Sequence, residues 1–198
     1  SGSFLRDALG KHWLLTGDLT HTDLLLADGD AYIKYLLTGE IEPLVANLEN
    51  TVSGLSVNQA FYTSEVRFTD RVTKFHNAYH NTFIAEQIPN INTKLLYNML
   101  TGDVADPLYL PLPAVKWKTN PTEFALLVTN ATSISFSVMI YNFDEMEKPL
   151  IGNLLRLEDG EYNWELTCEQ TSNNGMYTGG NLQIPIPGQQ ECILRLSR

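Results

Sequence analysis

The hydrophobic periodicity of this chain changes once, near Thr122. Beyond that residue, apolar and polar side chains alternate, which is typical of a strand with one buried face. From Ile134 to Ile140, for example, every second residue is a branched or aromatic hydrophobe. Short strands that each carry one hydrophobic face predict an antiparallel β-sandwich. The predicted strands, separated by turn residues, are 123–129, 133–143, 150–157, 161–168, 181–186 and 191–197.

Before about Asn98 the apolar residues recur with the period of a helix instead. Within 23–37 the hydrophobes lie near one stripe and the charged residues lie off it. Comparable patterns at 4–15 and 41–55 predict a helix on either side. Pro43 falls in the first turn of the last of these, where proline is tolerated. The sequence therefore predicts short amphipathic helices in a row.

One short motif recurs at the helix ends: LLTGD at 14–18, LLTGE at 36–40 and MLTGD at 99–103. Its glycine can take the left-handed conformation that closes a helix. Its acid can cap, or complement the charge of, the start of the element that follows. The first two copies are separated by one helix plus one turn, which is compatible with a helical repeat. Helix-ending chemistry that recurs by chance explains the motif equally well.

Residues 104–121 hold four of the chain's nine prolines, so they cannot form a regular helix. Their leucines, Tyr109 and Trp117 favour packing against the rest of the protein over a flexible linker. The predicted organisation is therefore α+β, with a helical region at 1–103, a packed Pro-rich connector at 104–121 and a β-sandwich domain at 122–198.

The charge balance narrows the range of partners. The 198 residues include 13 Lys and Arg against 23 Asp and Glu, which gives a net charge of -10. This charge disfavours nucleic acids and anionic membrane surfaces, and neutral or cationic ligands fit better. No apolar run is long enough for a membrane span, and the first residues show no signal-peptide pattern. A hydrophobic content of 43% predicts a soluble globular protein.

Both cysteines, Cys168 and Cys192, fall in predicted strands. They form either a disulfide between neighbouring strands or two small buried hydrophobes, since free cysteine is among the most buried residue types. With no CxxC pair and no histidine nearby, a metal site is not expected there. No Gly-rich phosphate loop occurs either, so the sequence predicts no metal and no cofactor.

The short helices with their LTGD-type turns, the Pro-rich segment and the small sandwich resemble the C-terminal region of bacterial six-hairpin, (α/α)-toroid proteins of glycosidase-like and polysaccharide-lyase-like type. Two segments carry the resemblance most directly: the hairpin LEDGEYNWEL at 157–166, and YTSEVRFTDRV at 62–72, which resembles a segment of the last toroid helices. The resemblance implies an N-terminal helical-hairpin array, toroid-like but incomplete, followed by the sandwich. Because a complete toroid needs many more helices, it also implies that the remainder of a longer polypeptide is a partner of this chain.

The segment 62–72 also supplies the candidate catalytic residues, Tyr62, Glu65, Arg67, Asp70 and Arg71. Glycoside hydrolysis uses two carboxylates, whereas lyases use a tyrosine or histidine base with a group that neutralises the sugar acid. These residue types serve either mechanism. The alternative is that the carboxylates pair with the arginines and hold the packing of an irregular segment.

Two further groups are weaker candidates. His76 and His80 have the i, i+4 spacing of paired zinc ligands, but the glutamate of a zinc peptidase is missing, which favours packed or surface histidines. Tyr177, in the Gly-rich stretch 171–181, is predicted to be exposed and to bind a ligand, since sugars stack on aromatic rings. Tyr162 and Trp164 share a face with core residues and are predicted to belong to the core.

The resemblance implies a C-terminal, non-catalytic portion of a carbohydrate-active bacterial protein, with the sandwich bracing the helical toroid and a carbohydrate as the ligand. The alternative is a stand-alone module that binds a glycan or a protein. The sequence leaves open whether this chain alone is an enzyme, and whether it is cytoplasmic or exported.

Overall fold

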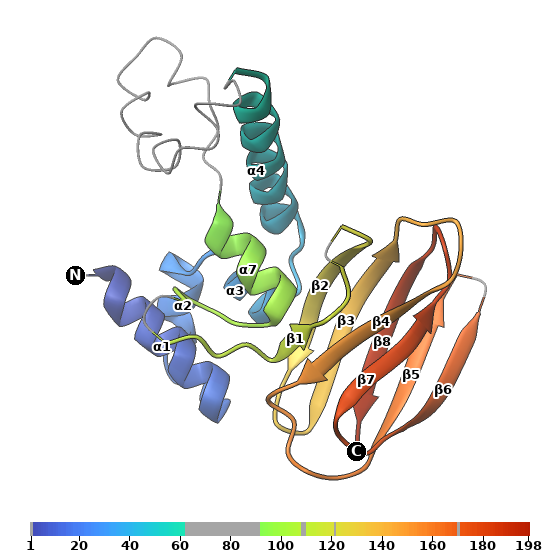
Figure 1. Cartoon of the computed structure of the whole chain (residues 1–198). Helices are drawn as coiled ribbons and strands as arrows, with labels where there is room; N and C mark the ends of the chain where they lie inside the picture. Colours follow the sequence, from blue (N-terminus) through green and yellow to red (C-terminus); the bar gives the residue numbers. More distant parts are fainter. Residues whose placement is uncertain (1, 62–91, 108–109, 121, 170) are drawn as a thin grey trace.

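The computed structural model describes residues 2–61, 92–107, 110–120, 122–169 and 171–198 (Figure 1). The described helices lie together on one side of the molecule and the strands form two layers on the other. The helices are α1 Gly2–Thr16, α2 Thr22–Asp28, α3 Ala31–Thr38, α4 Glu42–Phe61 and α7 Thr93–Thr101. The strands are β1 Val115–Trp117, β2 Phe124–Ala131, β3 Ser135–Asn142, β4 Lys148–Leu154, β5 Tyr162–Cys168, β6 Ser172–Tyr177, β7 Asn181–Ile186 and β8 Glu191–Ser197.

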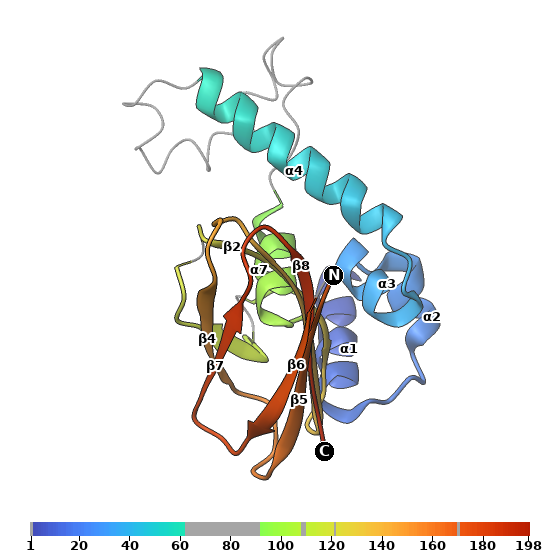
Figure 2. The same ribbon diagram turned by 90° about the vertical axis from the view of Figure 1, so that its right-hand side faces the viewer.

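The strands form two antiparallel sheets that pack face to face (Figures 1 and 2). One sheet has the strand order β1-β4-β7 and the other has the order β2-β3-β8-β5-β6. Buried and exposed residues alternate along β7 and β3, so the inward side chains of both sheets meet in one core. This core includes Val128, Phe136, Val138, Ile140, Leu150, Tyr162, Leu166, Leu182, Ile184, Ile186, Leu194 and Leu196.

The segments predicted as strands from their alternation coincide with β2, β3, β4, β5, β7 and β8, with small shifts at the ends. The sequence does not predict β1 or β6. β1 has only three residues and lies within the Pro-rich connector, and the polar β6 (SNNGMY) buries only its last residue. Neither strand carries the alternation on which the prediction depends.

The predicted fold class, a toroid-like array of helical hairpins followed by a sandwich, is wrong. The described helices do not pair as successive hairpins, and eight of the described segments are strands in two sheets. The helices instead share one small core, which includes Leu25, Tyr32, Ile33, Leu44 and Leu95. Figure 2 shows α4 running along the top of the molecule rather than beside α3.

The predicted helix at 23–37 is two helices, α2 and α3, separated by Gly29 and Asp30. The Asp30 side chain accepts a hydrogen bond from the Ile33 backbone N–H at 3.0 Å and so caps the start of α3. The apolar stripe continues across this break, which is why the periodicity alone predicts one helix.

All three LTG(D/E) turns close a helix in the predicted way. Gly17, Gly39 and Gly102 have φ values of 70°, 78° and 71°, in the left-handed region. In each copy the threonine hydroxyl donates to the backbone carbonyl four residues earlier, at 2.8 to 2.9 Å, and accepts from the N–H of the acid two residues later. The motif is therefore a recurring helix end built from local hydrogen bonds.

Asp18 and Asp103 do not cap a following helix, which is one of the two roles predicted for the acid of this motif. Asp18 instead accepts hydrogen bonds from the Thr20 backbone and hydroxyl. Both bonds lower the pKa of Asp18, to about 2, and the bond from the Thr20 hydroxyl has the larger effect. Asp103 is fully buried and pairs with Lys11 of α1. The same motif thus ends in an exposed acid in one copy and a buried acid in another.

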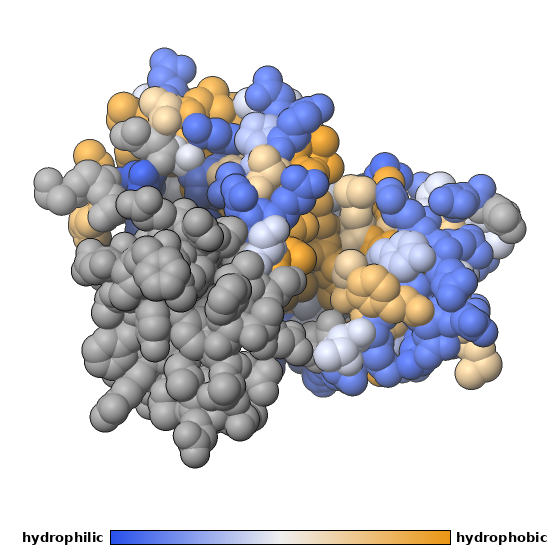
Figure 3. All heavy atoms as spheres, turned by 90° about the horizontal axis from the view of Figure 1, so that it is seen from above, coloured by the Kyte–Doolittle hydropathy of each residue, from blue (hydrophilic) through white to orange (hydrophobic). Residues whose placement is uncertain are grey.

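The helices contact the edge of the sandwich formed by β1 and β2 (Figure 1). The Tyr32 hydroxyl donates to the Val128 carbonyl at 2.7 Å, and the Trp117 indole N–H donates to the Leu100 carbonyl at 2.7 Å. Figure 3, which looks down on the molecule, shows hydrophobic side chains gathered where the helices meet the sandwich. This contact covers edge strands that would otherwise present unpaired backbone groups.

Gly102 lies at the tightest point of this contact and supports a first prediction. A Cβ at this position would lie 2.8 Å from Val128 Cγ1, whereas a Cβ at Gly39, with nearly the same φ, would meet nothing within 4 Å. We expect Gly39→Ala to cost about 1 kcal/mol through backbone strain alone. Gly102→Ala should cost about 2 kcal/mol, because overpacking is added to the strain. Urea unfolding of the two variants checks this, and equal losses would show that the contact at Gly102 is not tight.

Cys168 on β5 and Cys192 on β8 are directly opposite one another, with 4.1 Å between their Cα atoms, and they form a disulfide. Of the two alternatives that the sequence leaves open, the structure therefore contains the disulfide. The bond joins two neighbouring strands of the five-stranded sheet, and β6 pairs with β5 on the far side.

Candidate functional site

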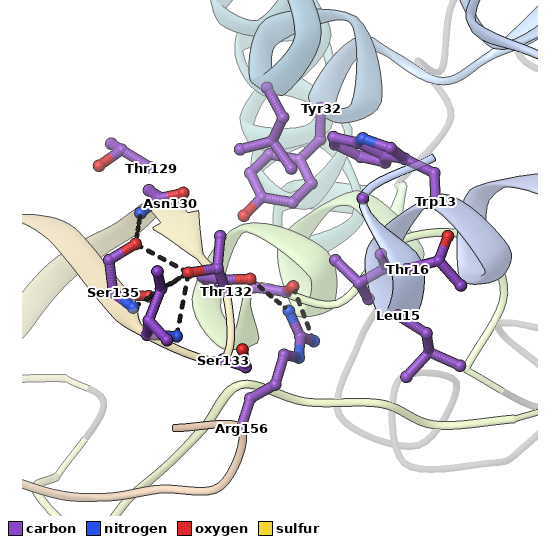
Figure 4. Close-up of a pocket in the computed structure, with 16 residues that line it drawn as sticks. Trp13, Leu15, Thr16, Tyr32, Thr129, Asn130, Thr132, Ser133, Ser135 and Arg156 are labelled. Atoms are coloured by element: carbon purple, nitrogen blue, oxygen red, sulfur yellow. Dashed lines mark hydrogen bonds between the residues drawn. The ribbon is translucent and has the colours of Figure 1, made fainter. Parts of the chain in front are cut away.

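A cavity that combines aromatic and polar side chains lies at the junction of the helices and the sandwich (Figure 4). It has a volume of about 620 Å³. The end of α1, one face of α3 and the turn that connects β2 to β3 form its walls, and Arg156 contributes from the segment that follows β4. We call this cavity the junction cleft.

The turn from Asn130 to Ser135 forms the polar wall of the junction cleft. The Thr132 hydroxyl accepts from the Ser135 backbone N–H at 3.0 Å and lies 2.8 Å from the Ser135 hydroxyl, to which the Asn130 amide also donates at 2.8 Å. The strand register shifts between Val128 and Asn130, which marks a bulge just before the turn. The result is a compact row of amide and hydroxyl groups whose positions are held by their own hydrogen bonds.

Helical residues form the opposite, apolar wall. Trp13 and Tyr32 lie on this wall together with Leu14, Leu15 and Leu36 (Figure 4). The Trp13 ring is partly exposed, whereas Tyr32 is buried and its hydroxyl is already bonded to Val128. Burial raises the pKa of Tyr32, so this residue is a neutral hydrogen-bond donor at any physiological pH. Trp13 is therefore the aromatic side chain of this wall that a ligand can contact.

Arg156 is held by three backbone carbonyls from different parts of the chain. Its guanidinium donates to the Ala131 carbonyl at 3.0 Å, to the Gly102 carbonyl at 3.3 Å, and to the Leu112 carbonyl. Desolvation lowers the pKa of Arg156, while the charge of Asp103 opposes the shift. The group remains a cation, because arginine does not lose its proton in proteins. Arg156 thus joins the end of α7, the connector and the end of β2 beside the junction cleft.

A buried ion pair fixes the same part of the connector that Arg156 binds. The side chains of Lys11 and Asp103 form an ion pair and are only 8% and 0% exposed. The Asp103 carboxylate also accepts from the Val104 N–H at 2.7 Å and from the Leu112 N–H at 2.8 Å. Since Asp103 binds the N–H of Leu112 and Arg156 binds its carbonyl, one connector residue is fixed at both backbone groups.

The structure does not place the predicted catalytic residues. Tyr62, Glu65, Arg67, Asp70 and Arg71 lie outside the described residues, and so do His76 and His80. Their proposed roles stay predictions. Among the residues that the structure does describe, no group of three or more His, Cys, Asp or Glu is arranged to hold a metal ion.

Tyr177 is described, and its predicted exposure is wrong. It is the last residue of β6, only 8% exposed, and its hydroxyl donates to the Gly180 carbonyl at 2.9 Å. Its ring borders a second, smaller pocket of about 420 Å³ at one end of the sandwich, next to Tyr162. Tyr162 is buried and Trp164 packs against the core, as their alternation indicates.

Trp13, Arg156 and the turn 130–135 carry no sequence signal of a site. Trp13 fits the apolar stripe of a helix, Arg156 falls in a predicted strand, and 130–132 is recognisable only as a turn. The spacing of these residues carries no signal, because they meet only when the helices dock on the edge of the sandwich.

No protein-family model and no curated protein matches the chain. Among solved structures, it is similar to a Bacillus halodurans protein assigned as an alpha-N-acetylgalactosaminidase, with 15% identity, a TM-score of 0.29, and coverage of 43% of this chain and 21% of that chain. A GH27 β-L-arabinopyranosidase from Geobacillus stearothermophilus gives 11% identity, a TM-score of 0.29, and coverage of 43% and 20%.

A structure described as a glycoside hydrolase gives 12% identity, a TM-score of 0.28, and coverage of 61% of this chain and 26% of that chain. Glycoside hydrolases are thus among the proteins to which the chain shows partial similarity, and the chain spans between 20% and 26% of their length. At these TM-scores the similarity carries no argument about activity. Separately, no described helix combines the length and the apolar character that a membrane span requires.

Proposed function

We propose that this chain recognises a carbohydrate in the junction cleft, as a non-catalytic portion of a larger carbohydrate-active protein. The observation that carries the proposal is the pairing of an accessible indole, Trp13, with the amide and hydroxyl row of Asn130, Thr132 and Ser135 across one cavity. Sugars have apolar C–H faces, which pack on aromatic rings, and hydroxyl groups, which need fixed donors and acceptors. The junction cleft offers both kinds of contact on opposite walls.

The groups that line the cleft supply binding rather than acid-base chemistry. Among the described lining residues the polar groups are hydroxyls, an amide, an indole N–H, a guanidinium and backbone atoms. Glycosidases need two carboxylates at the scissile bond, so a catalytic centre belongs elsewhere in our proposal. The larger protein remains a prediction that rests on the sequence resemblance, and the division at 103/104 and 121/122 remains a prediction that rests on the change in periodicity and the Pro-rich segment.

Direct binding measurements test this function. Isothermal titration calorimetry against a panel of neutral and acidic disaccharides should reveal a ligand, and Trp13→Leu should weaken its binding about tenfold, or 1.4 kcal/mol. Asn130→Ala should weaken it by a similar factor through the lost amide.

Asn163→Ala is the matched control for Asn130→Ala, because Asn163 is an exposed asparagine on β5 outside the junction cleft. It should leave the affinity unchanged. No binding by the wild-type chain, or equal losses in the two asparagine variants, would contradict recognition in this cleft. Turnover of the bound sugar by the isolated chain would contradict the non-catalytic role.

A further inference from the structure

The junction cleft has a positive charge in a strongly acidic protein. Arg156 is the only formally charged side chain among its described lining residues, although the whole chain has a net charge of -10. The overall charge favours neutral or cationic ligands, but a ligand in a partly enclosed cavity responds first to the nearest charge, which water screens least.

No carboxylate of the described residues neutralises Arg156 through an ion pair. The acid that acts on it electrostatically, Asp103, is itself paired with Lys11 and bonded to two backbone N–H groups. The three partners of the guanidinium are neutral carbonyls. They orient the group and leave its charge uncompensated.

Arg156 also retains hydrogen-bonding capacity. A guanidinium has five N–H groups, and three of them are used by the Ala131, Gly102 and Leu112 carbonyls. The remaining two can serve an anionic group that enters beside the polar wall (Figure 4). Hydrogen bonds between a cation and a carboxylate are about twice as strong as those between neutral groups.

We propose that the junction cleft selects an acidic sugar, with Arg156 as the residue that recognises its carboxylate. This inference rests on the proposed function and specifies the class of ligand. A single carboxylate matches the single cation, whereas a densely charged polyanion would be repelled by the net negative charge of the protein. A short oligosaccharide with one uronic-acid residue fits both conditions.

A matched pair of ligands tests the inference on the unaltered protein. Calorimetric titration with a disaccharide of one galacturonic acid and one neutral sugar should give an affinity about tenfold or more above that of its methyl ester, which has the same rings without the charge. Equal affinities for the acid and the ester would overturn the selection of an acidic sugar while leaving carbohydrate recognition intact. If neither acidic nor neutral sugars bind, the proposed function fails, and this inference fails with it.

A matched pair of variants tests the role of Arg156 without removing its structural bonds. Thr132→Asp and Thr132→Asn both keep an oxygen that can accept from the Ser135 N–H, so both can keep the turn. Only the aspartate adds a carboxylate, at the residue next to Ala131, whose carbonyl Arg156 binds, and we expect it to compete with the ligand for Arg156. We expect Thr132→Asp to bind the acid about tenfold more weakly than Thr132→Asn does, with no difference for a neutral sugar. Equal effects of the two variants on the acid would overturn the role of Arg156.

Discussion

Asp103→Asn is expected to lower the free energy of unfolding by about 4 kcal/mol, the largest loss we predict for a single substitution. The change removes the negative charge that compensates Lys11, and both side chains are buried. It also removes one of two carboxylate oxygens that accept from the Val104 and Leu112 backbones. Urea unfolding followed by circular dichroism measures the loss directly.

The chain provides a matched control for this substitution in another copy of the same motif. Asp18 follows Thr16 and Gly17 as Asp103 follows Thr101 and Gly102, but its side chain is 43% exposed and pairs with His12, and no lysine of the described residues pairs with it. Asp18→Asn should therefore have a much smaller effect. Similar losses in the two variants would show that burial of the Lys11–Asp103 pair contributes nothing beyond the local turn.

The double variant Lys11→Met/Asp103→Leu separates two explanations for a large loss. If an unpaired buried charge causes the loss, removing both charges should restore much of the stability. If the two backbone hydrogen bonds of Asp103 cause it, the double variant should be at least as unstable as Asp103→Asn, because leucine accepts neither bond.

Reduction of the Cys168–Cys192 disulfide is expected to lower the free energy of unfolding by about 3 kcal/mol, the second large effect. The bond closes a loop with a sequence separation of 24, and a loop of this size restricts the unfolded chain by about that amount. Unfolding with and without a reductant measures the difference.

The variant Cys168→Ala/Cys192→Ala is the control, because a reductant should not change its stability. A wild-type protein whose unfolding midpoint is the same with and without reductant would show that the bond does not form in solution. Because β6 joins the sheet only through β5, we expect hydrogen exchange of the β6 amides to respond most strongly to reduction.

The stability of the Lys11–Asp103 pair should also affect ligand binding in the junction cleft. Asp103 and Arg156 hold the N–H and the carbonyl of Leu112, so loosening the ion pair should also loosen the guanidinium that we assign to the ligand. The disulfide lies between β5 and β8, away from the residues that line the cleft. Weakened sugar binding in Asp103→Asn with unchanged binding in the reduced protein would agree with this view of the site.

Local patterns are the part of this protein that the sequence predicts well. The alternation around Ile134 predicts β3, and the glycine of each LTG(D/E) turn predicts its left-handed helix end. Both features depend on interactions within a few residues of the chain. Local patterns do not predict β6, because its pairing with β5 stabilises a segment that has no hydrophobic pattern of its own. They also do not predict the arrangement of the helices, because LTGD turns end helices without determining how those helices pack.

The sequence by itself determined the alternating strands, the amphipathic helices and the chemistry of the helix ends, because neighbouring residues create each of them. Only the tertiary structure decided that the two cysteine sulfurs join, that Asp103 rather than Asp18 is buried, and that Trp13, Thr132 and Arg156 line one cleft. The physical reason is the docking of the helices on the β1 and β2 edge of the sandwich. That contact brings together side chains more than a hundred positions apart, and no spacing in the sequence encodes it.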